Sequence, residues 1–189
     1  MKIFKKREIG ETTITMKIEA KMKGLKAENL FLMMKDLSYR AKMDHAPKQI
    51  KLIEQTSRNS DVIYVEIDLP FPLSNRDLVQ QRLYFGNKED PELIRSLGLY
   101  NCSHRYYVLL AQSIVHPDLP EKKKLVRAEM KMNYVIIEED PNDSTVAIMR
   151  IVSCQKLNGG VPDVMVNMAA SKIPHKMMES IINSYSKFF

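Results

Sequence analysis

Apolar and polar side chains alternate strictly over residues 12–22. Ile14, Met16 and Ile18 fall on one face, while the residues between them are polar or charged. This period of two predicts a β-strand with one buried and one solvent-facing side. Over residues 27–44 the apolar positions instead recur at helical spacing, which predicts an amphipathic helix.

Further strands are predicted after this helix, separated by short pieces rich in proline, aspartate and asparagine. Strands this close in sequence suit an antiparallel meander, because parallel strands need long crossovers. One connection, residues 86–103, is longer than a hairpin needs, and its segment PELIRSLGL predicts a short helix. The predicted strands cover residues 49–57, 61–69, 77–85, 104–115, 124–138 and 144–156.

A long helix is predicted at the C-terminus. Gly159 and Gly160 end the last strand, and Pro162 suits a first helical turn, where its missing N–H is not needed. Apolar residues then continue at helical spacing, and Pro174 is expected to kink or interrupt the helix. The expected fold class is α+β, with a curved antiparallel sheet wrapped around the C-terminal helix. Space left between them would form an internal apolar tunnel that a ligand must fill.

The composition suits a single domain, residues 1–189, with 44% hydrophobic residues. A net charge of +6 attracts anionic membranes or nucleic acid, but basic and acidic residues are interleaved, which argues against nucleic acid. Two cysteines cannot form a disulfide framework, so a reduced cytoplasmic protein is expected. No apolar run reaches the ~18 residues of a membrane span and no signal peptide is recognisable, so membrane contact should be peripheral.

Sequence signatures of catalysis and of metal or cofactor binding are absent. The chain contains no Gly-x-Ser-x-Gly nucleophile elbow and no glycine-rich phosphate loop. The four histidines are scattered, and Cys102 and His104 have no second ligand pair to complete a zinc site. We therefore expect no metal, no cofactor and no enzymatic activity.

Four segments together resemble the START lipid-transfer family, most closely its phosphatidylcholine-carrying branch. They are SYRAKMD (38–44), VIYVEIDLPFPLSNRDLVQQRLYF (62–85), VRAEM (126–130) and LNGGVPDVMVNMAA (157–170), in the order of the family. The resemblance runs over nearly the whole chain and implies a helix-grip fold around an apolar tunnel. Members usually begin with a further N-terminal helix, which this chain is expected to lack.

Arg40 and Asp44 lie one helical turn apart and would share a face. Taken alone, they also fit an ordinary surface ion pair. The resemblance implies that Arg40 meets the phosphate of a bound lipid and that Asp44 orients it. Arginine suits this role because its planar fork bonds two phosphate oxygens at once.

Glu66 and Arg82 form a second candidate pair, on strands expected to be antiparallel neighbours. The resemblance implies polar cavity residues beneath the lipid head group at these positions. The alternative is a solvent-facing ion pair across the two strands.

Further residues are assigned to the cavity, its gate and the membrane surface. The segment 116–124 and the C-terminal helix are the expected gates, and lysines beside an exposed leucine could touch an anionic bilayer or be an ordinary solvated run. Candidate cavity or gate residues are Met34, Tyr64, Leu78, Met165, Met168 and Pro174. Candidate membrane contacts are Leu119, Lys122, Lys123 and Lys124.

The expected function is an intracellular carrier of one phospholipid, either phosphatidylcholine or another glycerophospholipid. The positions that the resemblance gives to a choline-binding aromatic cage hold Met34, Val65, Leu78 and Lys131, so the head group is left open. We expect a monomer that visits membranes transiently. A lipid sensor that binds without transfer fits the sequence equally well, and an enzyme on the same fold would need an acid–base pair such as Glu66 with a tyrosine.

Overall fold

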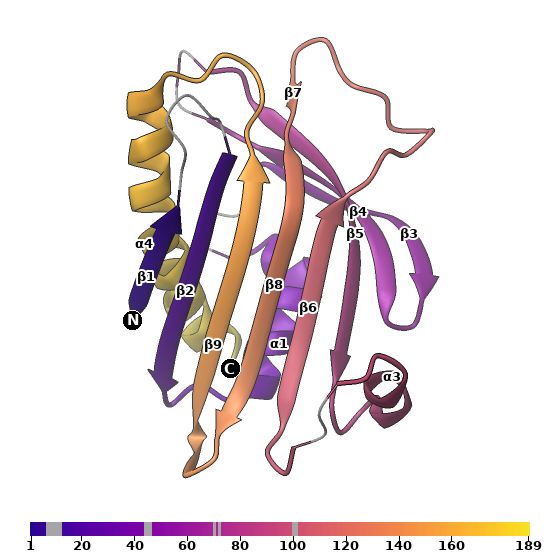
Figure 1. The fold of residues 1–189 in the computed structure, drawn as a ribbon, viewed down its shortest axis with the longest axis vertical. Helices are drawn as coiled ribbons and strands as arrows, with labels where there is room; N and C mark the ends of the chain where they lie inside the picture. Colours follow the sequence, from indigo (N-terminus) through magenta and orange to yellow (C-terminus); the bar gives the residue numbers. More distant parts are fainter. Residues whose placement is uncertain (7–12, 44–46, 70, 72, 100–101) are drawn as a thin grey trace.

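The computed structural model describes residues 1–6, 13–43, 47–69, 71, 73–99 and 102–189, without the side chains of residues 163, 169–171 and 173. Within this part of the chain the strands form one curved sheet in the order β1-β2-β9-β8-β6-β5-β4-β3, with antiparallel neighbours (Figure 1). β7 pairs in parallel with β5. The strands are β1 (Lys2–Lys6), β2 (Thr13–Lys23), β3 (Gln49–Ser57), β4 (Ser60–Ile67), β5 (Arg76–Gly86), β6 (Tyr106–Ser113), β7 (Val126–Arg127), β8 (Glu129–Asp140) and β9 (Asp143–Lys156).

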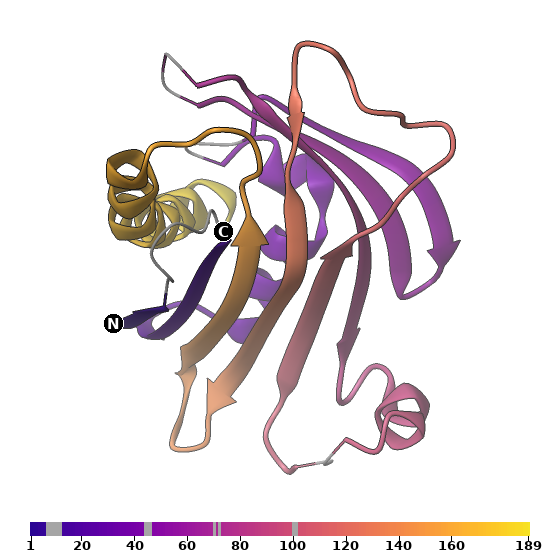
Figure 2. The same cartoon turned by 45° about the horizontal axis from the view of Figure 1, so that its top comes forward.

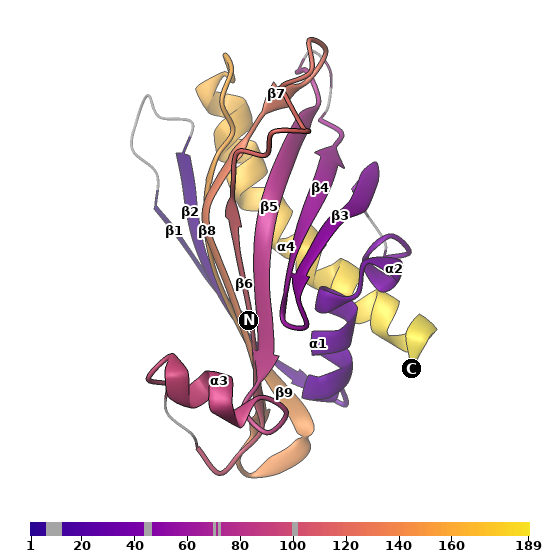
Figure 3. The ribbon, with the colours of Figure 1, turned by 90° about the vertical axis from the view of Figure 1, so that its right-hand side faces the viewer.

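The helices lie on both faces of the sheet. On the face that we call inner lie α1 (Ala27–Lys35), α2 (Leu37–Arg40) and the long α4 (Asp163–Phe188), whereas α3 (Pro91–Ser96) packs against one end of the opposite, outer face (Figures 2 and 3). The architecture is the expected helix-grip fold of the α+β class.

The main hydrophobic core lies between the inner face and the helices α1 and α4. Strand alternation sends Ile18, Tyr84 and Met149 to this face, where they meet Leu30 of α1 and Ile181 of α4. All five side chains are at most 3% exposed. The apolar stripes recognised in the sequence therefore form the contact between the sheet and the two helices.

Some predicted boundaries are wrong. The helix expected over residues 27–44 divides at Asp36, whose ψ of 124° is incompatible with a helix. The strand expected over 124–138 divides into β7 and β8, and β1 was not predicted. Pro174 was expected to kink or interrupt the C-terminal helix; it lies inside α4, which continues past it, so the helix is not interrupted there.

Candidate functional site

A buried ion pair joins two strands on the inner face. Asp61 stands opposite Arg82 in the register of β4 and β5. Arg82 donates from Nε and Nη2 to the two carboxylate oxygens of Asp61, at 2.7 and 2.6 Å, and both residues are at most 3% exposed. A third N–H, at Nη1, reaches the carbonyl of Lys35 at the end of α1, at 3.0 Å. Arg82 therefore ties the sheet to α1 as well as neutralising Asp61.

Arg40, the last residue of α2, adds a second cation to this region. The pKa of Arg40 is lowered to about 10, chiefly by burial of its guanidinium and then by the charge of Arg82, while the charge of Asp61 opposes the shift. Among the described residues no carboxylate lies within ion-pair distance of Arg40. The described part of the site thus carries an excess positive charge in a partly desolvated setting, which favours an anionic ligand.

Asp36 positions the short helix that carries Arg40. Its Oδ1 accepts a hydrogen bond from the N–H of Ser38 at 2.7 Å, so Asp36 caps α2 at the point where α1 ends. The hydrogen bonds from Ser38 lower the pKa of Asp36 more than its partial burial raises it. A pKa below its ordinary value means that the capping carboxylate stabilises the fold above about pH 4 and that this contribution is lost as the pH falls through the lowered pKa.

Replacing Asp36 with alanine is expected to lower the free energy of unfolding by about 1 kcal/mol at pH 7, because the cap of α2 is lost. Urea titrations of both proteins at pH 7 and in acid measure the difference, which should shrink in acid as the wild-type carboxylate becomes protonated. Asp118→Ala, in an exposed loop, is the control. A difference that grows in acid would argue against the cap.

Glu66, expected beneath the lipid head group, and Tyr64, expected in the cavity or its gate, lie on the outer face instead. Glu66 is opposite Asp77 rather than Arg82 in the register, and it pairs with Lys48 at 2.8 Å. The expected pairing of Glu66 with Arg82 is therefore wrong, because residues 61 and 66 have opposite parity along β4. Tyr64 also faces outward, where it packs with Val62 and Val79, so it does not line the inner face.

The segment between β6 and β7 packs on Tyr64 and so covers part of the outer face. Leu119 packs against the cluster around this tyrosine, and Lys122 donates to the Tyr64 hydroxyl at 3.0 Å. Lys123 and Lys124 are exposed. Of the three lysines, these two alone make no side-chain hydrogen bond or ion pair with another described residue. Their role at a membrane stays a prediction.

The other expected cavity residues are distributed along the inner face and α4. Leu78 is 3% exposed and packs with Ala128 and Met130, whereas Met34 is half-buried against the main core. In α4, Pro174 is buried, Met165 half-buried and Met168 exposed. Asp44 lies outside the described residues, as do several side chains of α4, so the apolar tunnel itself stays a prediction.

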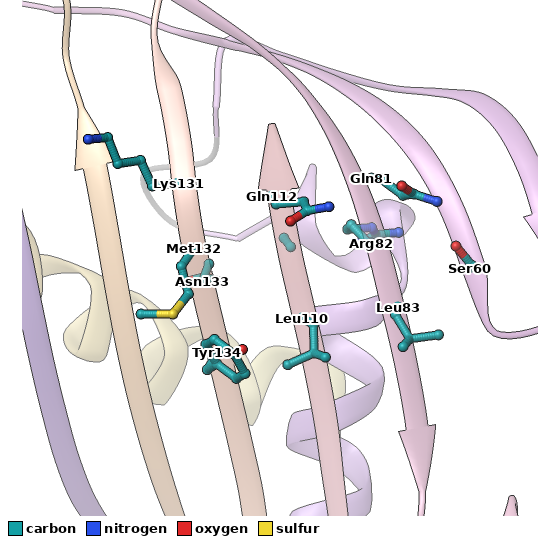
Figure 4. A pocket seen from close by; sticks show the side chains of 11 residues that line it. Ser60, Gln81, Arg82, Leu83, Leu110, Gln112, Lys131, Met132, Asn133 and Tyr134 are labelled. Carbon is teal, nitrogen blue, oxygen red and sulfur yellow. The ribbon is translucent and has the colours of Figure 1, made fainter. Parts of the chain in front are cut away.

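One pocket among the described residues is a hollow of about 460 Å³ on the outer face. Figure 4 shows Leu83, Leu110 and Tyr134 side by side on β5, β6 and β8, with the helices behind the sheet. Their register places them opposite in parity to Tyr84 and the rest of the core face. A second pocket, of about 190 Å³, lies between α1 and the end of β5. No described residue of α4 lines either pocket.

Arg76 joins two loops at the end of the sheet where β9 leads into α4. It is 3% exposed and donates to the carbonyls of Leu157 and Asn158, at 3.3 and 3.0 Å, and also to that of Ser74. The chain then turns through Gly159, whose φ of +67° favours glycine. The β4–β5 loop and the start of α4 are therefore held together at one end of the molecule (Figure 1).

Sequence reasoning missed Asp61, the partner of Arg82. Asp61 was placed at the start of a predicted strand, but the face of the sheet that its side chain takes was not predicted. An acidic residue directly before an uninterrupted apolar run, with an arginine on the next strand, is the signal that could have found the pair.

A curved antiparallel sheet that holds a long helix, with an ion pair buried on its inner face, defines the class of helix-grip proteins. The START domain model matches residues 1–179. Phosphatidylcholine transfer protein from Mus musculus is 31% identical over 147 residues, covering 77% of this chain and 61% of the relative. START domain-containing protein 10 from Homo sapiens is 25% identical over 182 residues, covering 96% and 56%.

The chain belongs to the START domain family. It spans about 61% of the length of the mouse phosphatidylcholine transfer protein that it matches. Solved structures agree on the fold: human STARD10 superposes with a TM-score of 0.80 at 22% identity, covering 98% of this chain and 69% of that one. Human StAR-related lipid transfer protein 5 gives a TM-score of 0.77 at 16% identity, covering 98% and 87%.

Proposed function

We propose that this protein carries one phospholipid between membranes, with the lipid phosphate at Arg40 and Arg82. The observation that carries the proposal is the charge of the inner site: Asp61 pairs with Arg82, and the nearby Arg40 adds a second guanidinium that has no carboxylate within ion-pair distance among the described residues. A phosphate diester supplies the missing negative charge and accepts several hydrogen bonds. The mouse and human relatives, one of them a phosphatidylcholine transfer protein by name, support the same class of ligand.

A carrier lowers the cost of moving acyl chains through water. Each CH₂ group returned to water costs about 0.8 kcal/mol, so a two-chain lipid essentially never leaves a bilayer alone. An apolar space beneath α4 would remove most of that cost.

The end of the molecule tied together by Arg76 is the proposed membrane-facing end. Phe71 in the β4–β5 loop is 94% exposed and Val164 at the start of α4 is 78% exposed. Both elements reach the same end of the molecule in Figures 1 and 2. Lys123 and Lys124, exposed in the β6–β7 connection, would add attraction to an anionic surface.

The proposed setting is the cytoplasm. Cys102 and Cys154 are both free thiols, as expected in a reducing compartment. None of the described helices is both long and apolar enough to cross a bilayer. We propose a monomer that meets membranes transiently and acts as a carrier rather than an enzyme.

A vesicle assay tests the proposal. Labelled phosphatidylcholine is placed in donor vesicles, and its appearance in acceptor vesicles is followed with increasing amounts of protein. A carrier should accelerate transfer in proportion to its concentration. Binding of the labelled lipid without accelerated transfer would instead identify a sensor. The absence of both binding and transfer would refute the proposal.

A further inference from the structure

Gln80 is a buried polar residue on the inner face whose side-chain amide has no hydrogen-bond partner among the described residues. It lies two residues from Arg82 on β5 and stands opposite Ile63 of β4, so its side chain shares the face of the buried ion pair. Gln80 is 7% exposed, yet no hydrogen bond joins its amide to any other described residue. A buried amide left unpaired costs about 1–3 kcal/mol, so such a group calls for a partner from outside the chain.

The side-chain amide of Gln80 is not fully enclosed by protein atoms. Thr13 carries the one side-chain polar atom of the described residues that is both unpaired and fully enclosed. The amide of Gln80, also unpaired, is therefore not sealed by protein atoms. It can both donate and accept a hydrogen bond, which a purely charged group cannot do.

The residues of β5 change from charged to apolar along the inner face. Arg82 lies in the charged site, Gln80 follows, and Leu78 comes next in an apolar cluster with Ala128 and Met130. Alternate residues on one face are about 7 Å apart. A glycerophospholipid has the same order of groups over a comparable length: phosphate, then the glycerol esters, then the acyl chains.

We propose that Gln80 donates a hydrogen bond to an ester carbonyl of the bound phospholipid and so makes the site prefer ester-linked over ether-linked lipids. This assignment rests on the proposed function, because it takes the phosphate to lie at Arg40 and Arg82. It also orients the ligand: the head group lies at the Arg82 level and the tails extend toward the Leu78 cluster.

Competition binding with two matched lipids tests the assignment. Diacyl phosphatidylcholine and its diether analogue, with equal chains, each displace a fluorescent phospholipid from the full-length protein. The wild type should bind the diacyl lipid about fivefold more tightly, the worth of one net hydrogen bond. Gln80→Leu, and Gln80→Met as a second variant of similar length, should bind both lipids equally.

Gln81→Leu is the matched control, since the neighbouring glutamine is exposed on the outer face. It should keep the wild-type preference. A wild type without preference, or a Gln80 variant that keeps the preference, overturns the assignment while the carrier proposal stands. A wild type that binds neither lipid overturns the proposed function and the assignment together.

Discussion

Asp61→Ala is expected to lower the free energy of unfolding by about 3–5 kcal/mol, because it leaves the charge of Arg82 buried without its counter-ion. Arg82 is 2% exposed and cannot turn out to solvent without breaking its bond to the Lys35 carbonyl. The nearby charge of Arg40 makes the unpaired state worse. Urea unfolding followed by circular dichroism at pH 7 measures the change.

Two further variants separate the ion pair from simple loss of volume. Replacing the pair together, as Asp61→Leu with Arg82→Met, should restore much of the stability, since apolar side chains of similar size often replace buried pairs at little cost. Glu54→Ala, on the exposed strand β3, should leave stability unchanged. If Asp61→Ala is within 1 kcal/mol of the wild type, the pair is not buried in solution as the structure shows.

Arg40→Gln is expected to reduce bound phospholipid by about 10–100-fold while leaving the protein folded. A hydrogen bond to a charged group contributes about 1.5–3 kcal/mol, and glutamine supplies neither the charge nor the fork of donors. Stability should not fall, because the substitution removes repulsion between Arg40 and Arg82. Lipid extraction and phosphorus analysis of the purified variant measure the loss.

Lys42→Gln is the control, because this exposed lysine lies two residues beyond Arg40 and removes the same charge from the same segment. It should retain its lipid. The two substitutions have different expected effects: Asp61→Ala lowers stability, whereas Arg40→Gln reduces bound lipid. If the Arg40→Gln variant retains as much lipid as the wild type, the assignment of Arg40 to the head-group site is wrong, although the described fold still stands.

Alternation made much of the sheet predictable from the sequence. The strict alternation over residues 12–22 places every second residue from Ile14 to Met22 on the buried side of β2, as observed. A helix was also expected at residue 27, and the apolar spacing of Leu30 and Met33 correctly marks its buried face. The pattern does not show which residues of β4 face inward, because five consecutive residues of this strand are buried and burial does not alternate.

This missing alternation explains the errors at the site. Because residues on both faces of β4 are buried, those on the outer face partly by the β6–β7 connection, the apolar run does not reveal which residues point inward. Glu66 and Tyr64 were therefore placed on the wrong face, and Asp61 was overlooked. The break at Asp36 was missed for another reason: its cap competes with a continuous apolar stripe that by itself favours an unbroken helix.

Native mass spectrometry of the gently purified full-length protein tests the central claim most directly, which is that the interior holds one phospholipid. The account predicts a complex heavier than the chain by the mass of one diacyl phospholipid, identified by extraction from the same sample. The bare chain alone, even after incubation with phosphatidylcholine vesicles, would contradict it.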